Sequence, residues 1–208
     1  MSDILRQVDE DLRKEKIASF WNRFKIYIIS ITLLLIISVS VYQYLEILKY
    51  NEKVSTIESY YKASNNESID EMLDNLNKIT TNNQFSQNLI DLKMADIHIA
   101  KGDIERGSKK LEQIFKSKNK SILRDLALYK YLMLKIDETT LDDLNNLIEN
   151  FNSKENNFNY LFSELVGIKN IIDGQYSEGK IIFESLLNDA SVSNEIKIRA
   201  EKYISIIN

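Results

Sequence analysis

Two stretches with matching glycines decide how this chain folds. Residues 100–107 read AKGDIERG, and residues 172–179 read IDGQYSEG. Both glycines recur at a step of 72 residues, and so do three apolar residues that follow: Gly102 with Gly174, Gly107 with Gly179, Leu111 with Phe183, Ile114 with Leu186, and Phe115 with Leu187. At half that step, 36 residues, Leu147 and Phe151 take the places of Leu111 and Phe115. A fixed step of this length predicts three stacked units, each a helical hairpin.

Small residues recur where two helices of a hairpin would touch. Their expected role is to let the helices pack closely and to relieve the turn between them. The residues expected to act in this way are Ala95, Gly102 and Gly107 in the first unit, and Gly167, Gly174 and Gly179 in the third. The middle unit departs from the pattern, with Tyr131, Glu138 and Asp143 in the corresponding positions.

This arrangement resembles the tetratricopeptide repeat, whose unit of about 34 residues is a helix–turn–helix. The chain lacks the proline that ends that motif, since it contains no proline at all. The resemblance implies that stacked hairpins bury a shared core. It also implies a concave surface, lined by the first helix of each unit, that binds a peptide or a small protein surface.

The rest of the chain is also predicted to be helical. With no proline and only five glycines, it lacks the turn signals that strand-rich folds need. Helices are predicted near residues 49–64, 68–80, 86–101, 103–118, 121–136, 140–151, 157–173, 176–188 and 193–207. The last helix is expected to cover one end of the repeat array, and the first two to cover the other. The predicted fold is all-α, with a repeat domain over residues 49–208.

A transmembrane helix is predicted over residues 26–45, IYIISITLLLIISVSVYQYL, which carry no charge. A helix of that length is about 30 Å long and matches the hydrocarbon core of a bilayer. Two alternatives are a buried helix of a soluble core and a cleaved signal peptide. The preceding 25 residues are long and charged for a signal peptide, and Leu45-Glu46-Ile47 is a poor cleavage site.

Residues 1–25 form a charged stub with amphipathic spacing, which predicts either a helix on the lipid surface or a docking segment. Trp21 and Lys25 are expected at the membrane interface. Before the span stand Arg13, Lys14, Lys16, Arg23 and Lys25, against Lys49 and Lys53 after it. This bias predicts a cytoplasmic N-terminus and a repeat domain on the far side, which in a bacterium is the periplasm.

No enzyme signature is present in the sequence. There is no cysteine, so thiol chemistry and cysteine zinc sites are excluded, and the sole histidine, His98, falls inside a predicted helix. No catalytic, metal or cofactor-binding residue is predicted. The net charge of −4 argues against a nucleic-acid partner.

The whole layout resembles the YfgM-like family, whose repeat domain is grouped with that of a cell-division coordinator, CpoB. The similarity includes the stub segment Val8-Asp9-Glu10-Asp11-Leu12-Arg13, followed by Trp21 and Lys25. The resemblance implies an ancillary subunit of a SecYEG-type translocon in the bacterial inner membrane. Its implied partners are a periplasmic prolyl-isomerase-type folding factor and exported proteins, toward which it would act like a chaperone. The alternative hypothesis is an envelope scaffold that coordinates cell division or cell-wall synthesis.

Overall fold

The computed structural model describes residues 2–66, 68–118, 121–151 and 158–207, which form α-helices and no strand. The predicted all-α class is therefore confirmed, and each predicted helix after residue 66 is found to within a few residues. The helices are α1 Ser2–Ser64, α2 Ile69–Asn77, α3 Gln84–Ala100, α4 Ile104–Phe115, α5 Ile122–Leu134, α6 Leu141–Phe151, α7 Asn159–Ile172, α8 Tyr176–Asn188 and α9 Asn194–Ile207.

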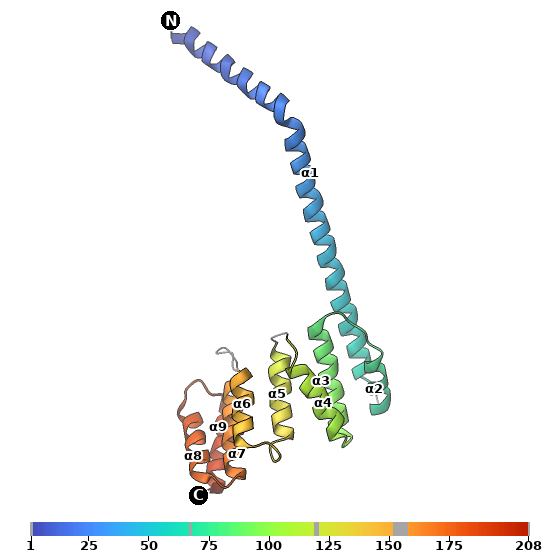
Figure 1. Ribbon diagram of the computed structural model, residues 1–208, viewed down its shortest axis with the longest axis vertical. Helices are drawn as coiled ribbons and strands as arrows, with labels where there is room; N and C mark the ends of the chain where they lie inside the picture. Colours follow the sequence, from blue (N-terminus) through green and yellow to red (C-terminus); the bar gives the residue numbers. More distant parts are fainter. Residues whose placement is uncertain (1, 67, 119–120, 152–157, 208) are drawn as a thin grey trace. The chain divides into compact units, whose positions relative to one another are not determined.

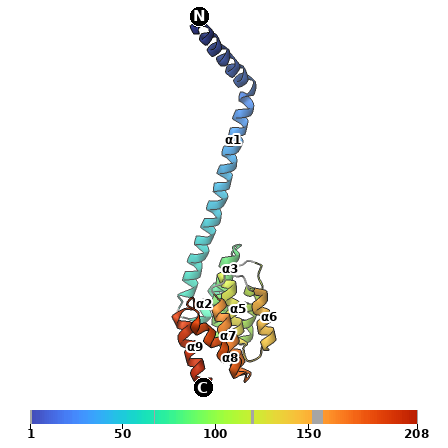
Figure 2. The ribbon, with the colours of Figure 1, turned by 90° about the vertical axis from the view of Figure 1, so that its left-hand side faces the viewer.

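The prediction of a separate helix over residues 49–64 is wrong. These residues are the last part of α1, which Figures 1 and 2 draw as one uninterrupted helix. Its continuity has a local cause, because the junction residues Leu45, Glu46, Leu48 and Lys49 are all strong helix formers. The chain divides into two compact units within this helix, residues 1–55 and 56–208.

The apolar part of α1 meets the requirements of a membrane span in its length and composition. Three of its hydroxyl groups are satisfied within the helix, since each donates to the carbonyl oxygen four residues earlier. Thr32 donates to Ile28 at 2.8 Å, Ser38 to Leu34 at 2.8 Å and Ser40 to Ile36 at 2.9 Å. Such bonds lower the cost of placing a hydroxyl in an apolar medium.

The repeat hairpins follow one another in chain order, and α3/α4 and α7/α8 are tightly packed pairs (Figure 1). The largest core cluster lies over α3 to α7 and includes Leu111, Leu128, Leu132, Leu144 and Leu165. A second cluster joins the last turns of α1 to α2 and α3, and a third joins α7, α8 and α9. Both ends of the array are thus covered by the helices predicted to cover them.

The two tight hairpins owe their close approach to glycine. A Cβ atom placed on Gly107 in α4 would lie 2.5 Å from Ile99 Cγ1 and 3.2 Å from the carbonyl oxygen of Ala95. A Cβ atom on Gly179 in α8 would lie 3.1 Å from the carbonyl oxygen of Gly167. The 2.5 Å contact is one that real Cβ atoms essentially never make, and the contacts of 3.1 and 3.2 Å are tighter than most, so the absence of these side chains favours the close approach of the backbones.

The middle hairpin, α5/α6, packs through large side chains instead. Its two backbones approach each other less closely than those of the other hairpins. Tyr131 and Phe151 both contact the ring of Phe115, with centroids at 5.1 and 6.1 Å. Arg124 also covers the Phe151 ring, 3.9 Å from its centroid. In the middle hairpin, aromatic side chains therefore fill the space between the helices, whereas in the other two hairpins glycine lets the backbones approach and leaves no such space.

The turns after α3 and α7 have the same geometry. Gly102 and Gly174 adopt positive φ angles of 81° and 79°. In each turn the glycine N–H and the next N–H donate to carbonyls of the last helical turn: Gly102 to Ile99 and Asp103 to His98, both at 2.9 Å; Gly174 to Ile171 at 3.0 Å and Gln175 to Asn170 at 2.8 Å. This is the Schellman motif, which places glycine in the left-handed conformation.

Replacing either turn glycine with alanine is expected to lower the free energy of unfolding by about 1 kcal/mol, the cost of a left-handed backbone for a residue with a Cβ atom. Nothing lies within 4 Å of a Cβ atom at Gly102 or Gly174, so steric clash adds no cost. Pulse proteolysis of the full chain in detergent across a urea series measures the change. Asparagine at the same positions is the control and is expected to cost less, because it tolerates this conformation.

Candidate functional site

A groove lies between α3 and α5, the first helices of two successive repeat units. Its volume is about 410 Å³, and its lining residues are Asp96 and Ile99 from α3, with Tyr129, Lys130, Met133 and Leu134 from α5. We call this surface the α3–α5 groove. It lies on the helices that were expected to carry the binding face.

The α3–α5 groove combines an apolar surface with a paired charge. Lys130 Nζ donates to both carboxylate oxygens of Asp96, at 2.7 and 2.8 Å, so the two charges compensate each other. Met133 is 44% exposed although it is apolar. An unbranched thioether adapts to differently shaped apolar partners. The groove is therefore suited to an apolar segment rather than to a charged one.

Tyr129 lines the α3–α5 groove, and its ring packs near two other aromatic rings. Its ring lies 6.4 Å, centroid to centroid, from both Phe158 and Phe162. Burial of the phenol raises its pKa, and the nearby charge of Glu164 raises it further. The hydroxyl therefore stays protonated at neutral pH and can donate or accept a hydrogen bond.

Two smaller hollows lie around α7 and α8, each of about 340 Å³. They share Ser163 and Ile182, and their other lining residues are Ile148, Asn159, Phe162 and Val166 in one, and Tyr160, Ile181, Ser185, Leu186 and Asp189 in the other. The pKa of Asp189 is lowered, chiefly by the backbone N–H of Ser191, which donates to the carboxylate at 2.7 Å. The Asp189 carboxylate is therefore already bonded within the turn to which Asp189 belongs.

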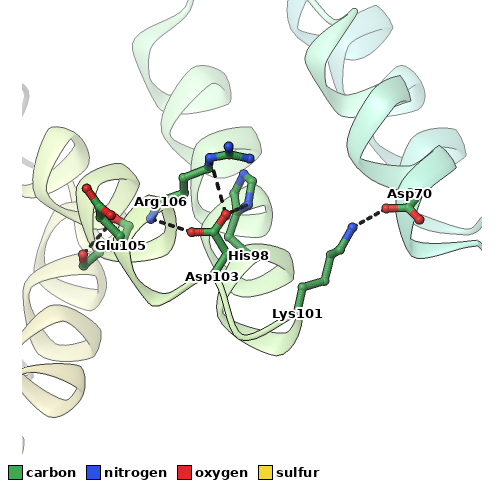
Figure 3. Close-up of polar contacts among 7 residues, drawn as sticks. Asp70, His98, Lys101, Asp103, Glu105 and Arg106 are labelled. Atoms are coloured by element: carbon green, nitrogen blue, oxygen red, sulfur yellow. Dashed lines mark hydrogen bonds and ion pairs between the residues drawn. The ribbon is translucent and has the colours of Figure 1, made fainter.

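A polar cluster surrounds the α3–α4 turn (Figure 3). The buried His98 places Nδ1 at 3.8 Å from Asp103 Oδ2, and the other carboxylate oxygen of Asp103 accepts the backbone N–H of Arg106 at 3.1 Å. Burial lowers the pKa of His98, and the charge of Asp103 acts in the opposite direction. Lys101 forms an ion pair with Asp70 at the start of α2. The cluster thus caps α4 and ties the turn to the neighbouring helix.

No group of three or more His, Cys, Asp or Glu side chains that could hold a metal ion occurs among the described residues. The side chains of the α3–α4 turn cluster make bonds to one another and to a helix end.

The predicted packing residues and the groove residues are separate sets. Ala95 is fully buried under Gly107, and Gly167 faces the ring of Phe183, so neither lines the groove. Trp21 and Lys25 are exposed on α1, where Lys25 Nζ donates to Asn22 Oδ1 at 3.4 Å.

Sequence reasoning did not identify the six groove residues. A signal for them was present in α5, which carries Met133 and Leu134 in addition to its buried residues Leu123, Ala127, Leu128 and Leu132. Apolar residues beyond those that fill the core are candidates for a binding surface.

A family model described as a tetratricopeptide repeat-like domain matches residues 18–198. This region includes the apolar part of α1 as well as the hairpins. No curated protein and no solved structure matches the chain.

Proposed function

The chain belongs to the tetratricopeptide repeat-like domain family, and from this premise we propose that it is a membrane-anchored module that binds other proteins and catalyses no reaction. The observation that carries the proposal is the α3–α5 groove, an uncovered and largely apolar hollow on the first helices of a repeat array. Stacked repeats of this kind commonly use such extended surfaces for binding.

The anchor in this proposal is residues 26–45 of α1. Their length and lack of charge suit a bilayer, and the family match extends across them to residue 18. The excess of Lys and Arg before the span supports a cytoplasmic N-terminus, with the repeat domain on the opposite side. Trp21 and Lys25 would then lie at the cytoplasmic headgroups.

In the finer proposal, the protein is an ancillary subunit of a Sec-type translocon in the bacterial inner membrane. Apolar segments of exported proteins would bind in the α3–α5 groove as they emerge, and a periplasmic prolyl-isomerase-type folding factor would bind nearby. Support comes from the resemblance of the stub and span to the YfgM-like family and from the adaptable Met133 in the groove.

Site-specific photocrosslinking in native membranes tests this function. Probes at Ile31 and Leu35 report what the span contacts, and a probe at Leu134 reports the groove. The control probe replaces Ile122, an exposed residue of the same helix that does not line the groove. We expect translocon subunits at the span positions and exported proteins at position 134 but not at position 122.

The Met133→Asp substitution is expected to reduce crosslinking from position 134 about tenfold, because a buried charge in an apolar contact costs over 1 kcal/mol. Unchanged crosslinking would contradict groove binding. Crosslinks to division or cell-wall proteins in place of translocon subunits would instead favour the scaffold hypothesis.

A further inference from the structure

An apolar stripe on α1 continues beyond the proposed membrane span. Its members are spaced alternately by three and four residues: Ile47, Tyr50, Val54, Ile57 and Tyr61. All five are between 38% and 67% exposed. We call these five residues the α1 stripe. The residues between them are mostly charged or polar, including Lys49, Glu52 and Glu58.

The stripe occupies a different face of α1 from the one that packs on the repeat domain. That packing face is formed by Thr56, Tyr60 and Ala63; Thr56 and Ala63 are buried, and Tyr60 and Ala63 pack on a core cluster with residues of α2 and α3. At 100° per residue, the centres of the two faces lie about 130° apart around the helix. The stripe side chains are exposed, so an apolar surface of α1 continues outside the proposed span.

We propose that the α1 stripe is one half of a parallel two-stranded coiled coil with a second copy of this chain. Its spacing is that of heptad positions a and d, with Ile47, Val54 and Tyr61 at a, and Tyr50 and Ile57 at d. The inference rests on the proposed membrane anchoring, because two copies inserted in the same direction meet in parallel. The tether also concentrates both copies, which a seam of only two heptads requires.

Charge complementarity favours a second copy as the partner. In this register Lys53 is a g position and Glu58 is the e position five residues later. In a parallel coiled coil, Lys53 of one copy lies beside Glu58 of the partner subunit, and the symmetric contact repeats the pair. Both side chains are exposed. An in-register dimer thus gains two ion pairs and covers both stripes.

The same register continues upstream into the span. There Leu33 and Ser40 fall at a positions, while Ile36 and Gln43 fall at d positions. Ser40 and Gln43 therefore lie next to each other on the seam near its membrane end. In lipid, such polar side chains bond across helices, and a polar residue in a coiled-coil seam fixes the register. The Gln43 amide can both donate to and accept from its symmetry mate.

Disulfide crosslinking of the full chain in membranes tests the dimer, since the natural sequence has no cysteine. Val54→Cys and Ile57→Cys place thiols on the seam, whereas Ser55→Cys and Ser59→Cys place them on other faces of the same turns. Because a disulfide forms only between Cβ atoms about 4 Å apart, we expect at least about tenfold more linked dimer from the seam positions. Equal yields at all four positions, or a link only to another protein, would overturn the proposal.

A charge swap tests the parallel register. In the Ile57→Cys background, Lys53→Glu is expected to lower the dimer yield about threefold, by placing two carboxylates side by side, and adding Glu58→Lys is expected to restore it. A yield of linked dimer that is the same in both variants as in the Ile57→Cys background would overturn the register. Resistance of the chain to alkaline extraction is measured on the same membranes. An anchored chain without seam crosslinks overturns the dimer alone, whereas a chain extracted from the membrane overturns the anchor and the dimer together.

Discussion

The Gly167→Val substitution is expected to lower the free energy of unfolding of the repeat domain by about 3 kcal/mol. A Cβ atom at this position would lie 2.8 Å from Phe183 Cζ and within about 3.1 Å of both ε carbons. The ring cannot move aside, because Phe183 is fully buried and stacks on Tyr203 with centroids 5.0 Å apart. Valine adds two methyl groups to this clash, in a core without room for them.

Pulse proteolysis of the full chain in detergent across a urea series measures the loss. Gly167→Ala combined with Phe183→Leu is the matched control, because it adds one carbon and removes the part of the ring that the carbon meets. The double variant is expected to be more stable than Gly167→Val. A Gly167→Val protein as stable as the natural chain would show that α7 and α8 do not depend on this close approach.

The sequence was sufficient to predict the hairpins that depend on glycine. The step of 72 residues pairs Gly102 with Gly174 and Gly107 with Gly179, and the structure gives each pair a common role, in a turn or at a helix contact. These positions are predictable because each needs one residue type. The two helices of the middle hairpin were predicted as well, but their packing was not, since aromatic residues such as Tyr131 and Phe151 can fill the space between helices in many arrangements.

Two features escaped prediction for physical reasons. The groove depends on how far apart α3 and α5 lie, and that separation is set by side chains from several helices together. Four of the five residues of the α1 stripe lie within the predicted helix 49–64, but the continuity of the stripe with the span follows only from the unbroken helix between Leu45 and Lys49. The end of the apolar segment predicts an end of the span at residue 45, whereas the helix itself continues to Ser64.

The Arg199→Ala substitution is expected to destabilise the repeat domain by about 2–3 kcal/mol, by leaving a buried carboxylate without its partner. Arg199 of α9 binds Glu164 of α7 through two hydrogen bonds, from Nε at 2.6 Å and from Nη2 at 2.7 Å. Glu164 is 2% exposed, while the Arg199 side chain is 42% exposed. Water can therefore reach the vacated site, which keeps the expected loss below that of a fully buried pair.

A double variant without either charge, measured in the same urea series, separates the effect of the ion pair from that of side-chain packing. Glu164→Met combined with Arg199→Met removes both charges and keeps most of the side-chain volume, so it is expected to recover most of the stability that Arg199→Ala loses. Arg199→Lys keeps the charge but not the two parallel hydrogen bonds. Its free energy of unfolding is expected to lie between that of Arg199→Ala and that of the double variant. If the double variant were as unstable as Arg199→Ala, the ion pair itself would hold α9 against α7. Recovery would mean that α9 stays in place chiefly through its apolar contacts, among them Ile196 and Ala200.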